Sequence, residues 1–245
     1  MPLPPRSPRR WRPELLVALA VLAAGCGTAL DPGIGGSGTL TESSRQVGDF
    51  SSLSVGGAVE VTLTTGPDSA VVVRADDNVQ ERIVTEVVDG ELRIGLSGPV
   101  RNATLEAHVT VPPDGLDRVE AGGAASVTGT ETLEAATFTV DLSGATRAFL
   151  VVEAEAVEAD VDGASVVNLS GKATDLVVRT SGASSVQLGE LPVATADVDA
   201  SGASRATVWV EDELRAVASG ASTIRYRGEP DLDSDSSGGS TIGPE

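Results

Sequence analysis

Few side chains in this sequence are of a type that does covalent chemistry. The 245 residues include one cysteine, Cys26, and one histidine, His108. A nucleophilic serine needs a base beside it, and no Gly-x-Ser-x-Gly segment that would present such a serine occurs in the chain. His108 stands in the alternating apolar stretch 103–111, so we interpret it as a strand residue and not as a catalytic base. We therefore predict no catalytic residues.

Paired carboxylates offer a second kind of chemistry. Asp160 and Asp162, and again Asp197 and Asp199, stand two residues apart, which on a strand places both side chains on one side. Two such groups serve as acid and base in glycoside hydrolases, so a polysaccharide-active enzyme is one alternative. Neither pair has an aromatic residue nearby to hold a sugar. We favour a solvated, solubilising face over an active site.

Metal chemistry has little support in the sequence. The stretch 231–235 alternates aspartates as a calcium-binding loop does, but the glycine at the sixth position and the glutamate at the twelfth are missing. We predict no metal site and no cofactor. Trp209 falls on the outward side of its predicted strand and is a candidate contact residue.

Cys26 ends a segment typical of an exported bacterial lipoprotein. Four arginines precede the apolar run 15–24, which is too short to cross a bilayer as a helix. The sequence Leu22-Ala23-Ala24-Gly25-Cys26 resembles a lipobox, in which small residues before the cysteine allow cleavage and the thiol is acylated. We predict a signal peptide over 1–25, lipidation of Cys26 with palmitate among the acyl chains, and an extracytoplasmic position on the cell membrane or cell surface. An ordinary signal peptide with an incidental cysteine is the alternative, and the choice between general and twin-arginine export stays open.

The amino-acid composition limits the kinds of partner that the chain can bind. The chain has 17 basic and 36 acidic residues, a net charge of −19, which repels phosphate backbones and excludes nucleic acid as a partner. After Cys26 the composition shifts to Gly, Ser and Thr without periodicity, and this predicts a flexible tether over 26–44. Aromatic residues make up only 2% of the chain, so the core must consist of smaller aliphatic side chains.

A glycine-centred repeat occupies the rest of the chain. Glycine, usually flanked by Ser or Asp and Ala, recurs every 18 to 21 residues. This period matches one coil of a β-solenoid. We expect each of these glycines to form a corner in the left-handed region, with the alanines that follow them lined up in single file. The predicted corner glycines are Gly123, Gly144, Gly163, Gly182, Gly202, Gly220 and Gly238.

Residues around each corner alternate as strands do. At even distances from the glycine stand apolar residues such as Phe138, Val140 and Leu150, and at odd distances stand charged or polar ones such as Asp141 and Arg147. The even positions therefore face the core. A hydroxyl two places after six of the seven glycines shares the inward side, and we expect it to bond the corner carbonyls. These hydroxyls belong to Thr146, Ser165, Ser184, Ser204, Ser222 and Ser240.

Residues 45–118 are also rich in strands but lack the strict period. A hairpin is predicted from 83–88 and 91–96, joined by Asp89-Gly90. We predict an all-β fold: a single-stranded parallel β-helix (β-solenoid), right-handed by the crossover preference, with a hairpin-rich cap over 45–118 and coils of about 19 residues over 119–245.

The order of these features resembles the bacterial DUF2807 domain, described as a "putative auto-transporter adhesin head" or GIN domain. The resemblance covers about 45–242, and the stretches that carry it are 49–55, 71–78, 87–94 and 218–228. It implies a β-helical, GIN-like extracytoplasmic domain over 45–245, often on a lipoprotein, whose molecular activity is not established. It implies no catalytic residues.

Three functions from different classes fit these observations. The favoured one is a membrane-anchored lipoprotein whose β-helical domain is a non-catalytic binding or adhesion surface. The alternatives are a polysaccharide-active enzyme and a structural or signalling accessory that binds another envelope protein. The expected partners are the membrane, through the lipid anchor, and an envelope protein or a glycan.

Overall fold

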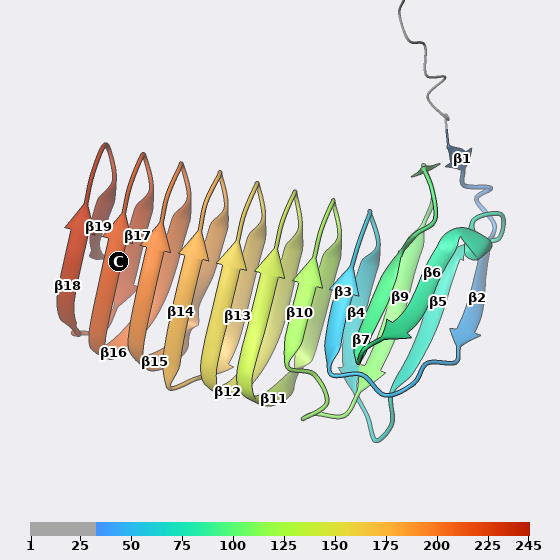
Figure 1. Cartoon of the computed structure of the whole chain (residues 1–245), viewed down its shortest axis with the longest axis horizontal. Helices are drawn as coiled ribbons and strands as arrows, with labels where there is room; N and C mark the ends of the chain where they lie inside the picture. Colours follow the sequence, from blue (N-terminus) through green and yellow to red (C-terminus); the bar gives the residue numbers. More distant parts are fainter. Residues whose placement is uncertain (1–32) are drawn as a thin grey trace, which may run out of the picture. The chain divides into compact units, whose positions relative to one another are not determined.

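The computed structural model describes residues 33–245, and the predicted signal peptide and Cys26 lie outside the described residues. The described part is nearly all β and forms a solenoid of about seven turns. Each coil has two strands and two corners, so the coils stack as two facing parallel sheets (Figure 1). The predicted fold class is confirmed.

Within each coil, the strand that comes before the glycine corner along the chain belongs to one sheet, and the strand that comes after the corner belongs to the other. The strands that precede a corner are β3 (Ser52–Val55), β10 (Arg118–Ala121), β14 (Asp175–Thr180) and β18 (Asp231–Ser236). The strands that follow a corner are β4 (Glu60–Thr65), β13 (Val166–Lys172), β17 (Thr223–Arg227) and β19 (Thr241–Pro244). Four longer strands pass round the second corner and belong to both sheets: β11 (Ser126–Leu142), β12 (Arg147–Val161), β15 (Ser185–Ala200) and β16 (Arg205–Ala218).

Successive coils stack with the corners in register. The amide N–H of the residue after each corner glycine donates to the carbonyl oxygen of the corner glycine one coil earlier, at 2.6 to 2.8 Å. The corner alanines therefore stand in single file, as the repeat predicts. In Figure 1 the nearer strands run up to these corners, the farther strands run down, and the coils advance to the left, which is a right-handed coil.

Corner glycines are required for two separate reasons. Their φ angles from Gly123 onward lie between +72° and +81°, a region that side chains with a Cβ rarely adopt. A Cβ at Gly163 would also lie 2.4 Å from the carbonyl oxygen of Gly144. The stacking distance of the coils thus excludes a side chain even where the backbone angle could be tolerated.

The core is a set of like residues stacked on one another. One inward column runs through Val61, Val127, Ala148 and Val167 in the sheet that follows the corners, and its members pair in register. Phe138 is the largest fully buried side chain. The corner hydroxyls of Thr146, Ser165, Ser184, Ser204 and Ser222 are buried, as predicted. Such a core stabilises only when coils stack, because no single coil covers its own apolar face.

The first corner lies farther upstream than the sequence analysis placed it. Gly57 has a φ of +84°, and its carbonyl oxygen accepts the amide of Ala124. The strands β3 and β4 on either side of it pair in parallel with β10 and β11. A complete coil therefore lies inside 45–118. The repeat hides it because the chain leaves the solenoid after β4 and returns only at β10.

The intervening residues build the cap at the N-terminal end of the coils. Its strands are β5 (Ala70–Asp76), β6 (Ile83–Val88), β7 (Glu91–Leu96), β8 (Val100–Arg101) and β9 (Leu105–Val111), with a short 3-10 helix, η1 (Gln80–Arg82). β7 and β9 extend the two sheets in parallel, and β6 and β5 then pair with them antiparallel. The hairpin predicted from β6 and β7 is confirmed, with Asp89 and Gly90 both at positive φ.

The predicted flexible tether over 26–44 is wrong for the residues from 33 onward. β1 (Ile34–Gly35) pairs with β8, and β2 (Leu40–Arg45) pairs antiparallel with β5. Composition misled here because small polar residues form an edge strand well when the neighbouring strand supplies its hydrogen bonds. A clasp secures the segment: Asp76 accepts the amides of Gly38 and Thr104, and Asn78 bonds the backbone of Ser37 and Gly35.

The aspartates at 231–235 form part of strand β18 and not a calcium loop. This last coil has serines where earlier coils have apolar inward residues, since Ser234 and Ser236 stand in register with Ala216 and Ala218. The core thus ends in hydroxyls that water can solvate. Within 33–245 no helix is long and apolar enough to cross a membrane.

Candidate binding surface

The two sheets present outward faces of different charge. The sheet that precedes the corners carries the acidic face, defined as its outward side chains from Arg118 in β10 to Asp235 in β18. Along one row of this face Glu120, Asp141 and Asp160 stand in register. The carboxylates of the acidic face are Glu120, Asp141, Glu158, Asp160, Asp162, Asp175, Asp197, Asp199, Glu213, Asp231, Asp233 and Asp235, and its guanidinium groups are Arg118, Arg179 and Arg215.

The carboxylate pairs found in the sequence lie on this face, and neighbouring coils engage three of their four members. Arg179 lies 3.7 Å from Asp160, Arg215 lies 2.7 Å from Asp197, and the Ser181 hydroxyl donates to Asp162. These contacts are largely exposed and contribute little to stability. Their geometry is that of a ladder in which arginines separate stacked carboxylates. Within 33–245 no group of three or more potential ligands could hold a metal ion.

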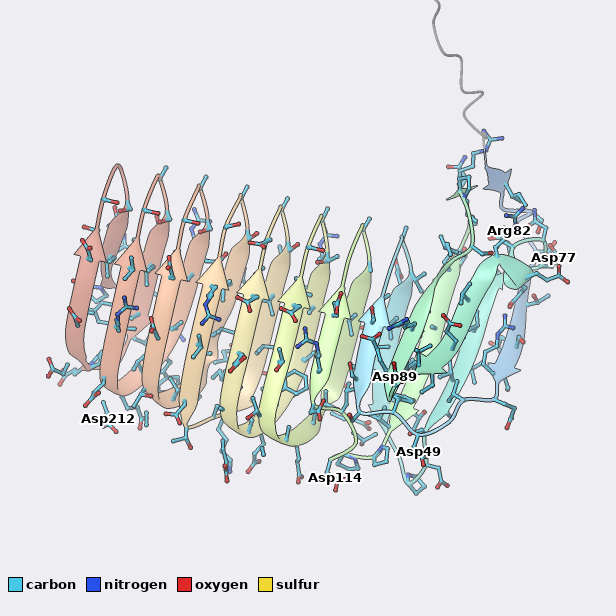
Figure 2. The ribbon with its side chains drawn as sticks, in the orientation of Figure 1. Asp49, Asp77, Arg82, Asp89, Asp114 and Asp212 are labelled. Carbon is cyan, nitrogen blue, oxygen red and sulfur yellow. The ribbon has the colours of Figure 1, made fainter. Side chains whose placement is uncertain are left out.

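The lower edge of the coils, opposite the glycine corners, is also acidic. Asp114 and Asp212 lie along it (Figure 2). A groove of about 580 Å³ opens there, with Glu134, Glu155 and the pair Glu153–Lys172 around a floor of alanines. The hydrogen bond from Lys172 to Glu153, with the attraction between the two charges, raises the pKa of Lys172. The one lysine at this groove is therefore held by a carboxylate.

The sheet that follows the corners carries the arginine face, defined as its outward side chains from Ser126 in β11 to Glu245. Three rows run across it, and the members of the first two pair in register from coil to coil. The first row holds Ser126, Arg147, Val166, Ser185, Arg205 and Thr223. The second row holds Thr128, Phe149, Asn168, Gln187, Thr207 and Arg225. The third row is interrupted by a bulge in β15: Val151 pairs with Ser170, and Trp209 pairs with Arg227, but Ser170 pairs with Glu190 whereas Trp209 pairs with Pro192.

A shallow cleft of about 280 Å³ lies on the arginine face across β13, β15, β16 and β17. Hydrogen-bonding side chains line it: Asn168, Ser185, Gln187, Glu190, Arg205, Thr207, Arg227 and Glu245. Arg227 pairs with Glu245 and donates to the carbonyl oxygen of Gly189, 3.0 Å away. Asn168 donates to Gln187 across the coils at 3.4 Å. The amides therefore form a ladder whose remaining donors and acceptors face solvent.

Trp209 lies on the arginine face beside this cleft, and 37% of its surface is exposed, as the outward position predicts. Phe149 is exposed to 39% on the same face, and the sequence analysis did not single it out. The arginines and amides were predicted as outward residues but not as a binding group. The signal was present, because Arg147, Arg205 and Arg225 all stand at odd distances after a corner glycine. His108 is exposed on β9, in register with Thr62, and is a strand residue as predicted.

The model of the family described as "Putative auto-transporter adhesin, head GIN domain" (DUF2807) matches residues 49–230. A search of curated proteins found no match.

Several solved structures share the fold. A "putative adhesin" from Bacteroides fragilis superposes with a TM-score of 0.81 at 20% identity, covering 87% of this chain and 100% of its own. A "putative adhesin" from Parabacteroides distasonis gives 0.71 at 22% identity, covering 86% and 99%. A "putative lipid binding protein" from the same organism gives 0.66 at 15% identity, covering 86% and 99%.

Proposed function

The chain belongs to the DUF2807 family, and we propose that it is a non-catalytic, adhesion-type binding protein held outside the cytoplasm by a lipid on Cys26. The family description and the names of the similar structures refer to adhesins or binding proteins. The proposal extends those descriptions to this chain.

The observation that carries the proposal is the in-register outward face of the solenoid. Identical backbone positions repeat about every 4.8 Å along the stack, so exposed side chains form straight rows. Rows of exposed polar groups suit an extended or repetitive partner, because successive coils can make the same contact again. A pocket that encloses a small substrate is the opposite arrangement.

The proposed anchor agrees with the way the chain enters the described unit. Ile34 joins the cap by pairing with Val100, so the cap end is the end nearer to Cys26 along the chain. Seven peptide steps separate Cys26 from Gly33, and a fully extended chain of that length reaches about 25 Å. A lipid on Cys26 would therefore keep the cap end close to the membrane surface.

Expression of the full chain in a bacterium that processes lipoproteins tests the anchor. We expect labelled palmitate to be incorporated and the protein to sediment with membranes. Cys26→Ser should abolish the label and release the protein from the membrane fraction. Palmitate incorporation that persists in Cys26→Ser would contradict the anchoring site.

Capture of envelope material by the full chain tests the binding role. The purified full chain should retain protein or glycan from cell-envelope extracts, and crosslinking in intact cells separates the two kinds of partner. A chain that retains nothing from envelopes, or that cleaves polysaccharides in a panel assay, would overturn the proposal.

A further inference from the structure

Of the broad surfaces of the coils, only the arginine face has more basic than acidic side chains and can attract an anion. The acidic face and the lower edge carry many carboxylates, whereas the arginine face has Arg147, Arg205, Arg225 and Arg227 with Glu190 and Glu245 near one end. An anionic partner is repelled from the first two surfaces and attracted to the third. The overall negative charge of the chain therefore selects where such a partner can bind.

Three of the four guanidinium groups have donors to spare. Within 33–245 neither Arg147 nor Arg205 has a hydrogen bond or ion pair with another side chain, and Arg225 donates only to the carbonyl oxygen of Pro244, 3.2 Å away. Arg225 pairs in register with Thr207, two residues from Arg205, so the Cα atoms of Arg205 and Arg225 lie about 8 Å apart. Arg227 is already neutralised by Glu245.

The spacing of the arginines indicates a polymer. Arg147 stands in the same row as Arg205, three coils away, and three strand spacings amount to about 14 Å. A single small anion cannot reach both sites. A chain with anionic groups at intervals can bind both, with the intervening Val166 and Ser185 beneath it.

The groups between the arginines suit sugars. Asn168, Gln187 and Thr207 offer amide and hydroxyl groups in one row, which can bond sugar hydroxyls as both donors and acceptors. Trp209 lies beside them on β16 and presents an aromatic surface of the kind on which a sugar ring packs. Aromatic residues embedded among amides on a flat sheet favour a hydrated glycan over the interior of a membrane.

We propose that the arginine face binds an acidic polysaccharide along the solenoid axis, with its carboxylate or sulfate groups on Arg205 and Arg225 and, in longer chains, also on Arg147. This inference rests on the proposed adhesion function and names the partner of that function. Because the contacts are exposed, binding should weaken as salt concentration rises.

Binding of the full chain in detergent to polygalacturonate tests the inference, with neutral dextran and anionic phosphatidylglycerol vesicles as comparison ligands. We expect Arg205→Gln combined with Arg225→Gln to weaken polygalacturonate binding at least tenfold. The matched control combines Arg179→Gln with Arg215→Gln, which removes the same charge from the acidic face and should change the affinity less than twofold.

A second variant separates specific contact from general charge and from misfolding. Arg147→Gln should weaken binding of long chains several-fold and leave binding of digalacturonate unchanged, since the short ligand cannot span 14 Å. Equal losses in the two double variants, equal binding of dextran, or binding to the vesicles but not to polygalacturonate would each overturn the inference. If the chain still captures envelope protein while failing on polygalacturonate, the inference falls and the proposed function stands.

Discussion

The amide N–H of Ala164 donates a hydrogen bond to the carbonyl oxygen of Gly144, 2.7 Å away in the coil before it. The same carbonyl oxygen blocks any side chain at Gly163. One contact thus aligns each coil on its neighbour and fixes the residue type at the corner. The straight rows of the arginine face depend on this alignment.

A side chain at a corner should cost more than its backbone angle alone. Gly163→Ala combines positive φ, about 1–2 kcal/mol, with overpacking against Gly144, about 1–3 kcal/mol more. The matched control is Gly90→Ala, because Gly90 has a φ of +81° but nothing within 4 Å of a new Cβ. Urea denaturation of both variants should give the larger loss for Gly163→Ala. Equal losses would mean that the stacking contact does not limit the corner.

The buried corner hydroxyls should contribute differently to the stability of the fold, according to whether each has a hydrogen-bond partner. The single proton of the Ser222 hydroxyl is shared between the carbonyl oxygens of Ala200 and Ser219, both 2.9 Å away, whereas the Ser184 hydroxyl has no partner among the described residues. Ser222→Ala should therefore destabilise by about 1–3 kcal/mol, and Ser184→Ala should be neutral or stabilising. Thermal unfolding of the two variants measures the difference, and a reversed order would contradict the hydrogen-bond assignment.

The clasp at Asp76 should control the attachment of β2. The two carboxylate oxygens of Asp76 accept different amides, so Asp76→Asn sets an NH₂ group against one N–H donor. We expect hydrogen exchange of the β2 amides to rise at least tenfold while exchange in β12 stays unchanged. Asp77→Asn is the control, because an asparagine oxygen can still accept the hydrogen bond from the Ser37 hydroxyl, and it should leave β2 protected.

Acid should weaken one link between β4 of the first coil and the part of β11 that forms the lower corner of the next coil. The backbone N–H and the hydroxyl of Thr65 donate to Glu131, and these bonds lower the pKa of Glu131. A lowered folded-state pKa means that the ionised group stabilises the fold above its ordinary pKa and loses this effect as pH falls through the folded value. The difference in thermal midpoint between the wild-type chain and Glu131→Ala should therefore be greatest at neutral pH and vanish in acid. A difference that is the same at neutral pH and in acid would contradict this link.

Sequence periodicity was enough to predict the coils, because Gly144, Gly163 and Gly182 recur at one spacing and the core columns follow from it. It was not enough at Gly57, where the cap separates this corner from Gly123 by 66 residues. Nor could composition reveal β2, since its partner β5 supplies the order that the polar residues lack. The repeat placed Arg205 and Arg225 on one outward face, but an outward position alone does not distinguish a binding surface from a solvated one, and their spacing follows from the register of the two coils.

Hydroxyl-radical footprinting of the full chain in contact with cell envelopes tests the central claim, that the arginine face is the binding surface. Phe149, Trp209 and Leu232 are all reactive and are exposed to 39%, 37% and 37%, so they serve as matched probes. Oxidation of Phe149 and Trp209 should fall on binding while oxidation of Leu232, on the last coil, stays constant. Protection of Leu232 alone, or of none of the three, would contradict the account.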